Sequence, residues 1–111
     1  PGVRAAFAIA PAIVQALPPE GLAKIKVPVA IILGDADPVA PPATNGLVAA
    51  KAIPHAELKV LPGVGHYDFL STCTPAAKDV PICTAKVPQD PTHAAAVDMA
   101  LAFFKRMLGA P

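Results

Sequence analysis

The chain has 111 residues, a usual size for one domain with a single hydrophobic core. Hydrophobic residues make up 54% of it, yet no stretch approaches the roughly 18 consecutive apolar residues of a membrane-spanning helix. The formal net charge is +1 and no basic cluster is present. The charge pattern therefore predicts neither a nucleic-acid partner nor binding to an anionic membrane surface.

The first third of the chain predicts two strands. The opening PGVRAAFAIAPAI contains no initiator methionine and no signal segment, so we expect a piece of a longer protein. Residues 4–10 are apolar and predict a buried strand, although their alanines would also suit a helix. A connection rich in proline and glycine follows, with room for one helical turn. Residues 28–34, PVAIILG, predict a parallel strand covered on both faces.

The middle of the chain predicts a helix, a strand and a long loop. Residues 42–53 carry apolar side chains at helical spacing, with Pro42 acceptable in the first turn. Residues 57–61 alternate apolar and polar side chains, which is typical of a strand with one solvated face. Residues 71–90 are rich in proline, contain both cysteines and show no periodicity, so we expect an ordered loop.

The last segment predicts a helix over residues 91–108. Asp90 is the expected N-cap, with Pro91 at the first helical position. The apolar stripe has spacings of four, three and four and consists of Val97, Leu101, Phe104 and Leu108.

The order of these elements predicts an α/β fold with a parallel sheet flanked by helices. In such sheets, ligands bind beyond the carboxyl ends of the strands. Two polar loops follow predicted strands at that edge, GDADPVAPP and PGVGHYDFL. Candidate functional residues are therefore sought in these two loops.

Both loops resemble the C-terminal part of an α/β-hydrolase, in its dienelactone-hydrolase-like branch, which includes esterases similar to platelet-activating-factor acetylhydrolase. The resemblance lies in Gly34 to Asp37 after one strand and Gly63 to His66 after the next, and extends from about residue 3 to residue 108. It implies that residues 1–111 are the C-terminal part of a single hydrolase domain. It also implies a carboxylic-ester hydrolase that acts on a small-molecule ester.

The chemistry of that family needs a nucleophile, an acid and a histidine, in this chain order. The resemblance assigns the acid to Asp37 and the general base to His66. The sequence contains no Gly-x-Ser-x-Gly or Gly-x-Cys-x-Gly, so the nucleophile is expected upstream, in the remainder of the hydrolase chain. Two alternatives remain: a non-catalytic binding or structural domain on a hydrolase scaffold, and an acyltransferase or peptidase of the same fold.

Asp35 competes with Asp37 as the acid, because aspartates are common in such turns. Pro38 biases Asp37 toward an extended conformation, and the family spacing also favours Asp37.

Asp68 is expected to support the site or to be purely structural. Tyr67 and Phe69 would either line the substrate pocket or pack beneath the loop. The other two histidines, His55 and His93, lack partner motifs and are interpreted as surface residues.

The two cysteines, Cys73 and Cys83, share one proline-rich loop. A zinc site would need further ligands at suitable spacing, and a catalytic thiol would need an elbow motif upstream of the histidine. We therefore expect a disulfide, which implies an oxidising compartment and hence a secreted or periplasmic protein. No cofactor or metal ion is expected.

Overall fold

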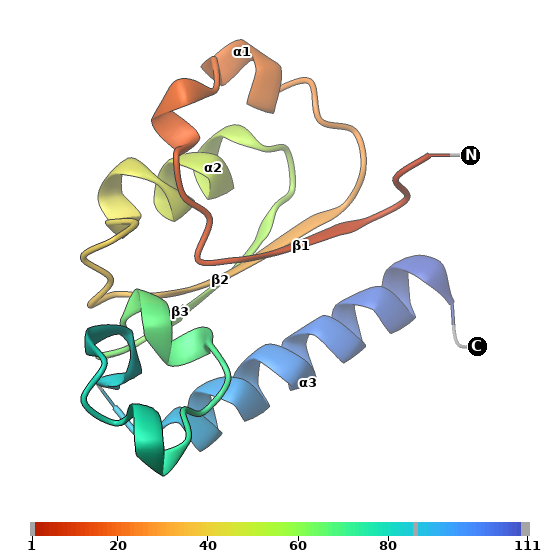
Figure 1. Cartoon of the computed structure of the whole chain (residues 1–111). Coiled ribbons are helices and arrows are strands. Elements are labelled where there is room, and N and C mark those ends of the chain that lie inside the picture. Colours follow the sequence, from red (N-terminus) through yellow and green to blue (C-terminus); the bar gives the residue numbers. More distant parts are fainter. Residues whose placement is uncertain (1, 86, 110–111) are drawn as a thin grey trace.

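The computed structural model describes residues 2–85 and 87–109 of the chain. Within this part, a sheet of parallel strands lies between layers of helices (Figure 1). The strands are adjacent in chain order, and they are β1 (Ala6–Ile9), β2 (Val29–Gly34) and β3 (Glu57–Leu61). This arrangement confirms the predicted α/β fold and parallel sheet.

The helices cover both faces of this sheet. Helices α1 (Pro19–Leu22) and α2 (Gly46–Ala52) lie over one face, and α3 (Gln89–Leu108) runs along the other (Figure 1). Short 3₁₀ turns join these elements at Val14–Ala16, Pro42–Thr44, His66–Phe69, Pro75–Ala77 and Pro81–Cys83. The last two turns lie in the predicted loop of residues 71–90, which ends earlier than predicted because α3 begins at Gln89.

Strand β2 is the centre of the fold because it is buried along its whole length. Alternate residues point to opposite faces of a strand. On the α1 and α2 face, Ile31 and Leu33 of β2 belong to the main hydrophobic cluster. On the other face, Phe103 of α3 is only 1% exposed and its ring lies 6.3 Å from that of Phe7. The continuous apolar run that predicted this strand therefore serves two cores at once.

The predicted helix over residues 42–53 is interrupted at Asn45, so its predicted extent is wrong. Asn45 has φ −129° and ψ −97°, which no helix contains. Its buried side chain accepts a hydrogen bond from the backbone N–H of Val14 at 3.2 Å and donates one to the carbonyl of Pro41. A 3₁₀ turn therefore precedes Asn45, and α2 begins after it.

The first strand is shorter than the predicted range of residues 4–10. Its pairing with β2 runs from Ala6 to Ile9, and Ala10 turns away with φ 44°. This left-handed conformation cannot continue a strand.

Helix α3 begins two residues earlier than predicted, with Pro88 at the N-cap. Asp90 therefore lies inside the first turn and does not cap the helix. Pro91 is accommodated there because the first N–H groups of a helix have no partner within it.

Most of the apolar stripe that predicted α3 is not buried against the sheet. Val97, Leu101 and Leu108 are exposed, whereas Phe103, outside the stripe, is buried. The stripe faces the β1 side, since Phe104 lies 6.2 Å from Phe7 and Val97 shares a hollow with Ile9. The far edge of β1 makes no strand pair within the described residues.

Candidate active site

Asp37 follows the carboxyl end of β2 and is fixed by the loop that it begins. Its Oδ1 accepts the backbone N–H groups of Val39 and Ala40, at 2.8 and 2.7 Å. This local pattern is characteristic of aspartate at the start of a turn. The side chain is 1% exposed, and Oδ2 is left to face the neighbouring loop.

His66 follows β3 at the same edge of the sheet. The chain turns at Gly63, whose φ of +72° is a conformation that glycine adopts without strain. His66 then opens the 3₁₀ turn His66–Phe69. Its Nδ1–H donates to Oδ2 of Asp37 at 2.7 Å, so the structure brings into direct contact the two residues that the resemblance assigned as acid and base.

Three further hydrogen bonds hold the two loops together. The N–H groups of Asp35 and Ala36 donate to the carbonyls of Leu61 and Val64, at 3.0 and 3.1 Å. In return, Oδ1 of Asp35 accepts the N–H of Gly63 at 2.7 Å. Asp35, the alternative acid, therefore bonds to the backbone of the histidine loop while Asp37 bonds to the imidazole.

The pair has the arrangement that a general base requires. Asp37 is buried, whereas the His66 side chain is 25% exposed. Bonding at Nδ1 fixes the tautomer in which Nδ1 carries the proton, so the neutral ring has a basic Nε2. Nε2 makes no hydrogen bond within the described part of the chain, so this nitrogen is available for proton transfer.

Two residues of α3 that the sequence did not mark as functional contact the His66 turn. His93, interpreted as a surface residue, is half-buried and donates from Nε2 to the carbonyl of Leu70 at 2.8 Å. Gln89 donates to the same carbonyl at 3.0 Å and to that of Asp68 at 3.3 Å. No sequence signal marks Gln89, because its role depends on how α3 docks. His55 is exposed, as expected.

The candidate pocket residues differ in exposure. Tyr67 is exposed, and its ring meets that of His66 edge-on at a centroid distance of 5.5 Å. Phe69 is half-buried. Tyr67 and His66 border a cavity of about 40 Å³, which Pro38 and Thr84 also line. This volume suits about one water molecule, so a substrate pocket needs further walls.

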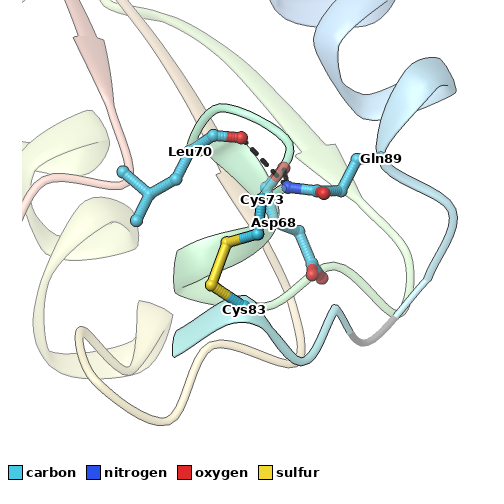
Figure 2. Close-up of a disulfide and its surroundings, with 5 residues drawn as sticks. All are labelled: Asp68, Leu70, Cys73, Cys83 and Gln89. Atoms are coloured by element: carbon cyan, nitrogen blue, oxygen red, sulfur yellow. Dashed lines mark hydrogen bonds between the residues drawn. A yellow bond between two sulfur atoms is a disulfide. The ribbon is translucent and has the colours of Figure 1, made fainter. Parts of the chain in front are cut away.

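The disulfide expected between Cys73 and Cys83 is present, with an S–S distance of 2.02 Å. The disulfide lies beside Asp68 (Figure 2). No group of three or more His, Cys, Asp or Glu side chains in residues 2–85 and 87–109 is arranged to hold a metal ion. In the same residues, no helix is long and apolar enough to cross a membrane.

Comparison of the whole structure with solved structures shows the fold. A predicted CIB-like hydrolase from Thermoplasma acidophilum aligns with a TM-score of 0.63 and 23% identity over 94% of this chain. The chain has the fold of the C-terminal portion of an α/β-hydrolase. A bromoperoxidase from Bacillus anthracis aligns less closely, with a TM-score of 0.49 and 24% identity over 79% of the chain.

The chain spans only 40% and 24% of the lengths of these two proteins. No family model and no curated protein sequence matches it. The α/β-hydrolase fold is thus established by structure, while the branch within that fold, the nucleophile and the substrate are matters for proposal.

Proposed function

We propose that the chain supplies the acid, Asp37, and the general base, His66, of a carboxylic-ester hydrolase in the dienelactone-hydrolase-like branch. The observation that carries this proposal is the 2.7 Å hydrogen bond from Nδ1 of the partly exposed imidazole to the buried carboxylate. Burying a carboxylate costs several kcal/mol unless hydrogen bonds and charge compensate it. Here the hydrogen bonds to Asp37 compensate that cost, and a ring nitrogen of His66 remains accessible to solvent. This arrangement fits a catalytic role better than a purely structural role in a turn.

In the proposed reaction, Nε2 of His66 takes the proton from a serine or cysteine nucleophile as that side chain attacks the ester carbonyl. The imidazolium then gives this proton to the departing alcohol as the carbon–oxygen bond breaks. Water, deprotonated by His66, releases the acid in the second half of the cycle. Asp37 remains ionised throughout, holds the ring in its tautomer and stabilises the imidazolium.

The nucleophile, the oxyanion hole and most of the pocket would come from the remainder of the hydrolase domain. Three observations support this part of the proposal. The printed sequence has no elbow motif, the outer edge of β1 is unpaired in the described residues, and the apolar stripe of α3 is exposed beside that edge. Further strands pairing with β1 would cover both features, because a parallel sheet normally has both faces and its edges protected.

The disulfide supports an oxidising environment, so a secreted or periplasmic location is part of the proposal. A small-molecule ester is the proposed substrate. An acyltransferase or a peptidase would use the same acid–histidine pair, and a binding domain would not use it at all. The experiment must therefore separate these activities.

The test measures hydrolysis of a short-chain nitrophenyl ester by the complete hydrolase. His66→Ala is expected to lower kcat by roughly 10⁴-fold or more, because no other group can deprotonate the nucleophile. His55→Asn is the matched control, since it removes an exposed histidine whose φ of 57° suits asparagine. Equal turnover by the two variants would exclude catalysis by His66. Parallel assays with the matching anilide and with an added acceptor alcohol identify peptidase and acyltransferase activities.

A further inference from the structure

Asp68 is a buried carboxylate close to the proposed pair but outside it. Its side chain belongs to the 3₁₀ turn that His66 begins, and the residue is 1% exposed. Oδ2 of Asp68 accepts the backbone N–H of Gly65 at 2.7 Å, and the N–H of Asp68 donates to the carbonyl of Gly65 at 3.3 Å. Both backbone polar groups of Gly65 are therefore bonded to Asp68.

Gly65 is the residue whose conformation aims the imidazole. It directly precedes His66 and has φ −97° and ψ 174°. Glycine has no Cβ and therefore has more conformational freedom than any other residue. Rotation about the bonds of Gly65 would swing the ring of His66 away from Oδ2 of Asp37. The two hydrogen bonds from Asp68 oppose this rotation.

The other end of the turn is fixed separately. Gln89 of α3 donates to the carbonyl of Leu70 at 3.0 Å and to that of Asp68 at 3.3 Å (Figure 2). His93 of α3 also donates to the carbonyl of Leu70, at 2.8 Å. The turn is thus attached to α3 at its C-terminal end. The remaining freedom lies at Gly65, where the carboxylate of Asp68 acts.

We propose that Asp68 is a positioning residue for His66. It fixes the peptide before the histidine so that Nδ1 meets Asp37 and Nε2 is presented to the nucleophile. The role belongs to its acceptor oxygen. A neutral acceptor of the same shape retains most of it, and an apolar side chain loses it. The catalytic consequence rests on the proposed function, but the orientation of the ring does not.

The first test measures the tautomer of the neutral His66 ring in this chain by long-range ¹H–¹⁵N NMR, with the pH raised until the spectrum of the ring stops changing. The unaltered chain and Asp68→Asn are expected to show mainly the Nδ1–H form. Asp68→Leu and Asp68→Ala are expected to convert most of the population to the Nε2–H form. Leu22→Ala is the control, because Leu22 is buried on the opposite face of the sheet and its loss destabilises the fold without touching the turn.

Folded Asp68→Leu and Asp68→Ala variants with the tautomer of the unaltered chain would overturn the proposal. The same shift in Leu22→Ala would overturn it too. If neither Asp68 variant folds, hydrogen exchange in the unaltered chain decides the matter. The Gly65 amide is expected to exchange about 100-fold or more slowly than that of Gly2, which has open surroundings. Equal rates would show that the carboxylate does not hold the Gly65 N–H.

The second test measures kinetics in the complete hydrolase. Asp68→Leu is expected to lower kcat about 100-fold and to change KM by less than about threefold, because a misplaced base slows chemistry without weakening substrate binding. Asp68→Asn is expected to restore most of kcat. If Asp68→Leu loses the Nδ1–H tautomer of His66 but keeps the kcat of the unaltered hydrolase, the positioning role of Asp68 is overturned. A complete protein without esterase activity in which the tautomer responds as predicted would refute the proposed function and support the positioning role.

Discussion

Gly34 and Val64 approach so closely that no side chain fits between them. A Cβ atom at Gly34 would collide with the backbone carbonyl of Val64, two residues before His66. Gly34 ends β2 and begins the loop that carries Asp37, so the two loops meet backbone to backbone at this point. The glycine therefore sets the separation between the acid and the histidine.

Gly34→Ala is expected to force the loops apart and to lower the free energy of unfolding by about 1–3 kcal/mol, as overpacking does elsewhere. Urea denaturation of this chain measures the loss. Gly21→Ala is the matched control. A Cβ there would meet only Pro18, at an ordinary 3.4 Å, and alanine in α1 is expected to be neutral or to stabilise by up to about 1 kcal/mol. Equal stability of the two variants would contradict the role of Gly34.

Substitution of the two aspartates of the acid loop is expected to have different effects. Asp35→Ala removes the acceptor for the Gly63 N–H and is expected to cost about 1 kcal/mol of stability. Because its carboxylate does not contact the imidazole, most of the activity of the complete hydrolase should remain. Asp37→Ala should abolish nearly all activity. Loss of activity in Asp35→Ala with little effect in Asp37→Ala would reassign the acid.

The disulfide is expected to stabilise the chain because it closes a loop between two residues that are ten apart in sequence. The loop-entropy model gives roughly 2.5–3 kcal/mol for a loop of this length. The double variant Cys73→Ser with Cys83→Ser should therefore unfold at a correspondingly lower urea concentration. A reducing agent should shift the unaltered chain in the same direction and leave the double variant unchanged. No shift in either comparison would show that the bond contributes nothing to stability.

The 111-residue chain by itself is expected not to turn over esters. An acid and a histidine cannot run the acyl mechanism without a nucleophile and oxyanion-hole donors. A nitrophenyl ester assay of the purified chain checks this, with His66→Ala as the control for contamination. Turnover well above that of the control would mean that the nucleophile lies within the printed sequence.

The sequence predicted the parts of the fold that depend on local pattern and strand order. The strand pattern placed the two loops after β2 and β3 at one edge of the sheet, because parallel strands end at the same edge. Within these loops, the resemblance to the hydrolase family selected Asp37 and His66. The family spacing and the conformational bias of Pro38 favoured Asp37 over Asp35 as the acid. In the structure, Asp35 bonds to the backbone of Gly63 instead of the imidazole.

Long-range contacts explain the predictions that were wrong or incomplete. Asn45 breaks the expected helix because its side chain bonds to Val14, which lies 31 residues away in sequence. The supporting contacts of Gln89 and His93 depend on the docking of α3, which no local pattern encodes. The apolar stripe of α3 correctly predicted a helix, but its periodicity could not show which face of α3 packs against the sheet of this chain.

The central claim is that Asp37 and His66 act as one catalytic unit, and a double-mutant cycle on kcat in the complete hydrolase tests it most directly. Asp37→Asn alone should lower kcat by up to about 10⁴-fold, because the amide favours the wrong imidazole tautomer. His66→Ala should lower it at least as much, and the double variant should be no slower than His66→Ala, since groups that act as a unit have non-additive effects. Near-normal turnover in the single variants, or losses that multiply in the double variant, would contradict the account.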